Sequence, residues 1–165
     1  MEPRQGRMKE RKKDGADLPE LLGHVVFGTK GRRRIIDDRL RARLWEYLGG
    51  IARHEFGGIV RVGGTEDHVH GLIRLRADTS VAEAMRKWKS LSIGWVHREF
   101  SDLDAFAWQG GYGAFSVSPS REAGVISYIE NQMEHHREVS FEEEFEGMLA
   151  RCGIEFDRRY LWTGE

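Results

Sequence analysis

Two histidines separated by a single residue, His68 and His70, have the type and spacing that most directly suggest chemistry in this chain. Successive side chains of a β-strand point to opposite faces, so both imidazoles would share one face while Val69 packs into the core. Two neutral imidazoles on one face can bind a single divalent metal ion. The same spacing also fits two half-exposed strand histidines without a chemical role, so a second group has to decide between these interpretations.

Tyr128 and Gln132 supply such a group, because they lie four positions apart on a predicted helix and are therefore neighbours on its surface. A tyrosine hydroxyl is a weak nucleophile at its ordinary pKa of about 10. A metal ion that polarises and orients a phosphate would allow it to attack and form a covalent phosphotyrosine. The side-chain oxygen of Gln132 would serve as a third metal ligand. Taken alone, Tyr128 also fits an ordinary packed helix residue, and Gln132 a solvated one.

The hydrophobic pattern predicts the elements that must position these residues. In chain order they are a strand at 21–30, a helix at 38–56, strands at 59–63 and 67–75, a helix at 80–100, a strand at 114–118, a helix from 119 to about 136, and a helix at 140–152. The order βαββαβ predicts an α+β fold, with a ferredoxin-like antiparallel sheet and helices on one face. The other face would be open to present His68 and His70, and an extra C-terminal helix would carry Tyr128.

Length and composition indicate one globular domain over residues 20–165, preceded by a flexible basic arm at 1–19. The chain has 165 residues, of which 39% are hydrophobic, and it includes eight Phe and five Trp. No stretch approaches the roughly eighteen apolar residues of a membrane span, and no apolar signal core follows the N-terminus. The single cysteine, Cys152, excludes an internal disulfide framework and a cysteine-based zinc site. These features predict a cytoplasmic protein that does not contact a membrane.

The charge is distributed unevenly, although the formal net charge is only −1. Basic residues gather in the first third of the chain, and acidic residues gather near residues 142–146, which permits a nucleic-acid-binding face without a high isoelectric point. Arg32, Arg33 and Arg34 would bind phosphates, because the guanidinium fork matches phosphate oxygens. Trp108 and Tyr112 would stack on bases of a single strand. Solvated helix faces explain the charges equally well, and packing of the loop explains both aromatic residues.

Several motifs, at this spacing and in this order, resemble the single-tyrosine HUH transposases of the smallest bacterial insertion sequences, the IS200-like family. The resemblance covers roughly residues 22–162. The matching stretches are His24–Lys30 (HVVFGTK), Gly64–His70 (GTEDHVH), Trp108–Ser118 (WQGGYGAFSVS), Tyr128–Gln132 (YIENQ), Glu134–Arg137 (EHHR) and Asp157–Trp162 (DRRYLW).

The resemblance implies a definite chemistry. His68 and His70 match the paired metal-binding histidines of that family, Tyr128 matches its nucleophile, and Gln132 matches its third metal ligand. Such enzymes bind Mg²⁺ or Mn²⁺, recognise hairpins at element ends, and cut and rejoin single-stranded DNA through a 5′-phosphotyrosine. They resemble obligate homodimers in which the tyrosine helix of one subunit completes the metal site of the other.

Three interpretations remain open at this stage. The first is a metal-dependent DNA strand transferase and endonuclease, that is, a transposase. The second is a host-adopted relative that processes hairpins without moving an element. The third is a non-catalytic module for single-stranded nucleic acid, which would need neither the metal nor Tyr128.

Three further residues near the predicted site also allow different roles. His136 fits either a further metal ligand or a histidine at a helix end. Asp67 fits either a residue that tunes the metal site or a turn residue, and His24 fits a core position.

Overall fold

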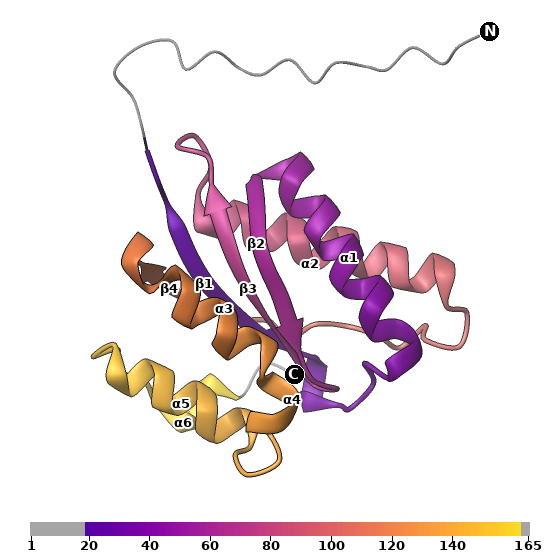
Figure 1. Cartoon of the computed structure of the whole chain (residues 1–165). Helices are drawn as coiled ribbons and strands as arrows, with labels where there is room; N and C mark the ends of the chain where they lie inside the picture. The colour runs from indigo at the N-terminus through magenta and orange to yellow at the C-terminus, as the bar shows by residue number, and fades with distance from the viewer. Residues whose placement is uncertain (1–18, 163–165) are drawn as a thin grey trace, which may run out of the picture.

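A four-stranded antiparallel sheet forms the centre of the computed structural model, which describes residues 19–162 (Figure 1). Its strands are β1 (Leu22–Gly28), β2 (Gly57–Gly64), β3 (His68–Leu75) and β4 (Gly113–Val117), in the spatial order β2-β3-β1-β4. This is the strand order of the ferredoxin-like βαββαβ fold, so the predicted fold class is confirmed. The basic arm predicted at 1–19 falls outside the described residues, except for its last residue.

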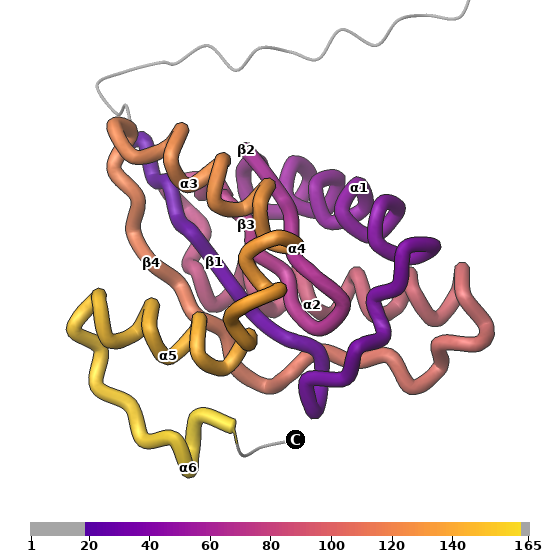
Figure 2. The backbone as a smooth tube through the Cα atoms, turned by 60° about the horizontal axis from the view of Figure 1, so that its bottom comes forward, coloured from indigo at the N-terminus to yellow at the C-terminus, as the bar shows by residue number. Residues whose placement is uncertain are grey.

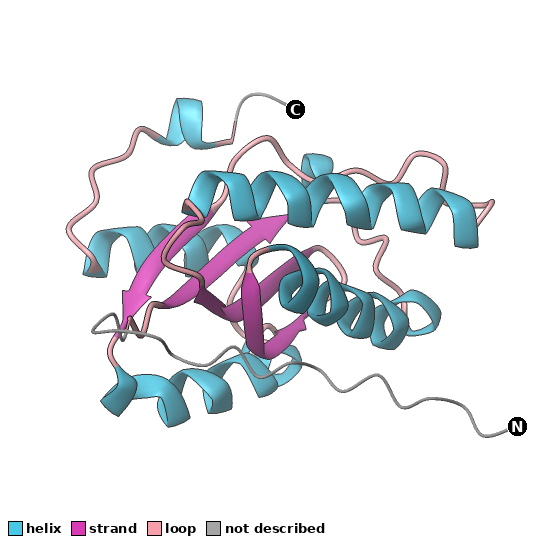
Figure 3. Ribbon diagram, turned by 90° about the horizontal axis from the view of Figure 1, so that it is seen from above, coloured by secondary structure: helices cyan, strands magenta, loops and turns pink. Residues whose placement is uncertain are grey.

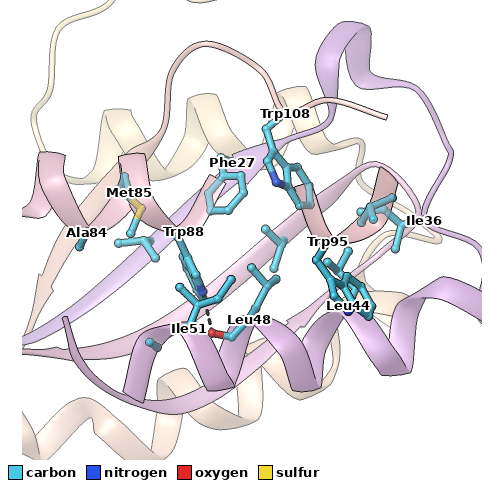
Figure 4. Packing of buried hydrophobic residues seen from close by; sticks show 14 of the residues in the cluster. Phe27, Ile36, Leu44, Leu48, Ile51, Ala84, Met85, Trp88, Trp95 and Trp108 are labelled. Carbon is cyan, nitrogen blue, oxygen red and sulfur yellow. Dashed lines mark hydrogen bonds between the residues drawn. The ribbon is translucent and has the colours of Figure 1, made fainter. Parts of the chain in front are cut away.

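Two long helices cover one face of the sheet. They are α1 (Asp38–Glu55) and α2 (Val81–Glu99), and side-chain oxygens of Asp37 and Ser80 cap their first turns. The larger hydrophobic core lies between these helices and the sheet, where Phe27 and Trp88 are fully buried (Figure 4). The Trp88 indole N–H donates to the carbonyl oxygen of Leu48 at 2.8 Å, which ties α2 to α1.

The opposite face is covered as well, so the expectation that it lies open is wrong. The chain continues from α3 (Glu122–Glu130) through the short α4 (Gln132–His135) into α5 (Phe141–Arg151) (Figure 2). Ile129 of α3 packs with Leu22 and Leu72, and Phe145 of α5 packs with Val26. Helices therefore lie on both faces of the sheet (Figure 3), and any site on this face is enclosed rather than exposed.

Two details differ from the predicted elements. The helix expected from 119 to about 136 is interrupted at Asn131, whose side-chain amide donates to the carbonyl oxygen of Ser127 at 2.8 Å and so competes with the regular helix. A short helix, α6 (Arg158–Leu161), follows α5 and was not predicted. The 3₁₀ turns Lys30–Arg32 and Pro119–Arg121 complete the elements. None of the helices in residues 19–162 is both long and apolar enough to cross a bilayer.

Candidate active site

Strand β3 places His68 and His70 on the face covered by α3, α4 and α5. Val69 between them points to the other face and is fully buried in the larger core, as the strand periodicity predicts. Both imidazoles are also fully buried, because the helices close over them. The two rings lie 5.1 Å apart between their centroids, so their nitrogens can serve one site.

The carboxylate of Glu144, which α5 delivers, lies at the centre of this site. Its Oε1 lies 2.9 Å from His70 Nε2 and 3.6 Å from His68 Nε2. Its Oε2 accepts hydrogen bonds from the Tyr128 hydroxyl and, at 3.2 Å, from the Gln132 side-chain amide. Burial opposes ionisation of Glu144, but the adjacent His136 ring and hydrogen bonds from His70 and Tyr128 outweigh it and hold the pKa of the carboxyl well below its usual range.

Tyr128 reaches the site from its own chain. It lies on α3, and its ring approaches the His70 ring edge-on at 5.8 Å between centroids. Burial, followed by the adjacent Glu144 carboxylate, raises the pKa of the Tyr128 hydroxyl. The phenol is therefore held in its neutral form in this arrangement.

The donor atoms around Glu144 have the chemistry and the closeness that a metal ion requires. Ligand atoms of four residues all lie within 4.8 Å of one another: His68, His70, His136 and Glu144. Gln132 joins them, because its Oε1 lies 3.0 Å from His68 Nε2. Imidazole nitrogens with a carboxylate and an amide oxygen form a mixed set that suits a divalent transition metal such as Mn²⁺. The residues therefore fit a divalent metal ion.

Hydrogen bonds behind His68 leave one of its nitrogens available as a ligand. Nδ1 lies 2.7 Å from Asp67 Oδ1, and Nε2 faces the oxygen of Gln132. Asp67 and Gln132 both present acceptor oxygens to the His68 ring. An imidazole that carries a proton on each nitrogen would donate to both oxygens. Alternatively, a metal ion could lie between Nε2 and the Gln132 oxygen. In the second case Asp67 holds the Nδ1 proton, as carboxylates behind metal-binding histidines commonly do. Asp67 thus lies where the metal-tuning interpretation places it.

His24 supports His70 in a comparable way. His24 Nε2 lies 2.8 Å from His70 Nδ1, so one of these nitrogens donates and the other accepts. Burial, and then the neighbouring His70, lowers the pKa of His24 to about 3. Burial also lowers the pKa of His70 to about 4, although Glu144 acts in the opposite direction. Both rings are therefore neutral near pH 7, which is the form in which an imidazole binds metal.

His136 lies at the end of α4 and also faces the cluster. Its ring packs on His68 at 4.4 Å between centroids, and its Nε2 lies 3.2 Å from Glu144 Oε1. That buried nitrogen nevertheless has no hydrogen bond of good geometry among the described residues. Burial acts to lower the pKa of His136, but the Glu144 carboxylate outweighs it and raises the pKa. A buried ring nitrogen aimed at the cluster without a proper partner fits a ligand position.

The residues predicted to contact DNA differ in their exposure and in their partners. Trp108 is buried, and its indole N–H donates to Ser92 Oγ at 2.9 Å, so packing explains it and its ring is not available for stacking. Arg32 pairs with Glu142 at 2.6 Å. Arg33, Arg34 and Tyr112 are exposed, and only Arg34 among them borders a cavity beside the cluster, together with His136.

Glu144 is the residue of the site that sequence reasoning missed, because it stood in a run of acidic residues that suggested a solvated surface. One signal was present. Phe141, Phe145 and Met148 form the buried face of α5 at helical spacing, and Glu144 lies on that same face. A carboxylate on the apolar face of an amphipathic helix is buried, and a buried carboxylate needs partners.

Comparisons with known proteins identify the family of the chain and agree with its fold. The family model described as "Transposase IS200 like" matches residues 18–132. A solved structure of a putative transposase from Deinococcus radiodurans R1 is 25% identical, with a TM-score of 0.60, and the match covers 73% of this chain and 97% of that one. A REP-associated tyrosine transposase bound to a REP hairpin is 12% identical, with a TM-score of 0.53 over 70% of this chain and 68% of that one, and shows the shared fold. No curated protein matches the chain.

Proposed function

The chain belongs to the IS200-like transposase family, and from this premise we propose that it cuts and rejoins single-stranded DNA through a covalent 5′-phosphotyrosine at Tyr128. The observation that carries the proposal is the convergence of the Tyr128 hydroxyl, two strand histidines and a buried carboxylate in one enclosed site. A phenol hydroxyl beside a cluster that fits a divalent metal suits nucleophilic attack on a phosphodiester.

The proposed step is a transesterification at phosphorus. Tyr128 Oη forms a bond to the scissile phosphorus, and the bond from phosphorus to the 3′ oxygen breaks, which leaves a free 3′ hydroxyl. Glu144 Oε2 already accepts the phenol hydrogen bond, so it is placed to receive that proton and to return it to the departing 3′ oxygen, which becomes the free hydroxyl. Rejoining reverses the step when a 3′ hydroxyl attacks the phosphotyrosine. Because one phosphoester replaces another, no external energy source is required.

The ligands proposed for the metal are His68, His70 and Gln132, joined by Glu144 and His136. When bound, the metal would polarise the scissile phosphate and offset the charge of Glu144. Mg²⁺ or Mn²⁺ is the proposed ion, since the carboxylate and amide oxygens of the donor set suit both. Mn²⁺ binding itself is measurable by calorimetry. Glu144→Gln should weaken it if the carboxylate is a ligand.

A cleavage assay with matched tyrosine variants tests the proposal. The probe is a labelled single-stranded hairpin oligonucleotide from the flanks of the gene, incubated with Mg²⁺ or Mn²⁺ and run on a denaturing gel. We expect a metal-dependent covalent protein–DNA band that Tyr128→Phe abolishes and the control Tyr160→Phe retains, because Tyr160 is exposed on α6. Binding of the hairpin without a covalent band, with either metal, would instead identify a non-catalytic module.

DNA hairpins as partners and a homodimer with shared sites belong to the same proposal. The solved REP-associated relative, which shares the fold, carries a REP hairpin. In the described residues Tyr128 already contacts Glu144 of its own chain, so complementation tests the sharing. A mixture of Tyr128→Phe and His68→Ala chains regains cleavage if tyrosine helices are exchanged, and stays inactive if each chain assembles its own site.

A further inference from the structure

A groove of about 850 Å³ opens beside Tyr128, between β4, α3 and the C-terminal end of α5. Its volume lies in the range of about 300–1,000 Å³ typical of small-molecule pockets, which suits a few nucleotides rather than a duplex. Of the residues of the site described above, Tyr128 and His24 line the groove. The rest of the groove therefore needs an explanation of its own.

The charge of the groove is positive. Arg121 and Arg151 line it, and no carboxylate of the described residues does. Neither guanidinium forms a hydrogen bond or an ion pair with any residue between 19 and 162, whereas Arg74 pairs with both Glu20 and Glu122. Two arginines without internal partners, in a concave surface without acidic residues, are available to bind an anion from outside.

The remaining lining offers both kinds of contact that a single strand needs. The hydroxyls of Ser118 and Ser120 can donate to phosphate oxygens, and Phe115 and Met148 provide apolar surface for a base.

We propose that this groove holds the single-stranded DNA segment next to the scissile phosphate, with Arg121 and Arg151 binding its backbone phosphates. The position of Tyr128 carries the assignment, because a strand attacked by its hydroxyl must continue into the adjoining space. The inference deepens the proposed function and rests on it, since single-stranded DNA is the substrate in both. Arg121 and Arg151 are binding and positioning residues in this assignment, not catalytic ones.

The test measures binding without chemistry. Fluorescein-labelled (dT)15 is titrated into the full chain in EDTA, and anisotropy is read at several salt concentrations. Each phosphate contact on a single strand contributes about 0.7 to the slope of log K against log salt, so Arg121→Gln/Arg151→Gln should lower the slope by about 1.4. The control is Arg86→Gln, an exposed arginine of α2 on the other face of the sheet, which should leave the slope unchanged.

The single cysteine of the chain gives an independent readout. Cys152 is exposed and lines the groove beside Arg151. Bound (dT)15 should slow its reaction with a maleimide, and raising the salt concentration should restore the rate.

A double variant that binds with the slope of Arg86→Gln, or an alkylation rate unaffected by saturating (dT)15, would overturn the assignment. These measurements need neither metal nor cleavage. The binding measurements therefore test the groove alone, whereas the covalent protein–DNA band tests the strand-transfer activity. Failure of one proposal can be distinguished from failure of the other.

Discussion

Gly63 on β2 offers a way to move the tyrosine helix without removing any group of the site. A Cβ atom added at Gly63 would lie 2.6 Å from the main-chain oxygen of Ile129 and 2.7 Å from its Cγ2. Ordinary van der Waals contact begins at 3.4 Å, so α3 or β2 must shift by about 0.8 Å to accept Gly63→Ala. A main-chain oxygen cannot rotate away as a side chain can, so the spacing between α3 and β2 has to change.

The displacement should reach the nucleophile directly. Tyr128 immediately precedes Ile129 on α3, whereas His68 and His70 lie on β3, which the ladder with β2 and β1 holds on both sides. Overpacking of this kind destabilises a protein by about 1–3 kcal/mol. Misplacement of a reacting group by about 1 Å can cost about 100-fold in rate. We therefore expect Gly63→Ala to lose far more cleavage than its stability explains.

Gly58→Ala is the matched control, because Gly58 lies on the same strand and a Cβ atom there meets nothing within 4 Å. At such a position, alanine should change the free energy of unfolding by at most about 1 kcal/mol, towards greater stability. Urea unfolding gives the stability of both variants. The rate of covalent adduct formation, measured where both are fully folded, gives the effect on the site.

Equal adduct rates for Gly63→Ala and Gly58→Ala would refute the reasoning, because they would show that α3 does not depend on this contact for its position. A second variant shows whether the added Cβ atom is crowded by the main chain of Ile129 or by its side chain. Ile129→Ala removes the Cγ2 contact but leaves the carbonyl oxygen, so it should not restore cleavage to Gly63→Ala. Full restoration would show that the side chain alone is responsible.

Two further predictions concern stability. Ser140→Ala removes the capping box of α5, in which Ser140 Oγ accepts from the Glu143 N–H at 3.2 Å, and should cost about 1 kcal/mol in urea unfolding; an equal loss for the mid-helix control Ser90→Ala would contradict this. Burial lowers the pKa of Lys89 to about 8, so between about pH 8 and 10.5 the folded chain binds fewer protons than the unfolded chain and its stability rises with pH. Lys89→Met should remove that rise from unfolding free energies measured across this range, and parallel curves for the two proteins would argue against it.

Local periodicity predicted the parts of this protein that depend on neighbouring residues. Alternation along β3 placed His68 and His70 on one face and Val69 in the core, because a strand repeats every two residues. Helix capping signals at Asp37 or Asp38 and at Thr79 or Ser80 marked where α1 and α2 begin. In the structure the caps are Asp37 and Ser80, whose side chains accept hydrogen bonds from the first turn. These features follow from local geometry, so a single sequence is sufficient to find them.

The parts that could not be predicted depend on how distant segments dock. Glu144 contacts His70 across 74 positions of sequence, and that contact exists because Phe145 and its neighbours seat α5 on Val26. Trp108 stood in a glycine-rich loop, where stacking on a base and packing of the loop explained it equally well. A β-bridge between Thr29 and Trp108 draws that loop against the core. No local sequence pattern predicts either of these long-range contacts.

The docking of α5 also constrains how a dimer could share sites. Residues 131–140 alone join α3 to α5, and Tyr128, Gln132, His136 and Glu144 all lie on the continuous segment Glu122–Arg151 that these two helices and their connection form. Their mutual contacts, including Tyr128 to Glu144 and Gln132 to Glu144, would be kept if the segment moved as one unit. An exchange between subunits would therefore transfer Glu144 together with Tyr128 and leave only the strand histidines behind. In that event a mixture of Glu144→Ala and His68→Ala chains should regain cleavage, whereas a mixture of Glu144→Ala and Tyr128→Phe chains should stay inactive. The two mixtures would therefore show whether Glu144 is exchanged together with Tyr128.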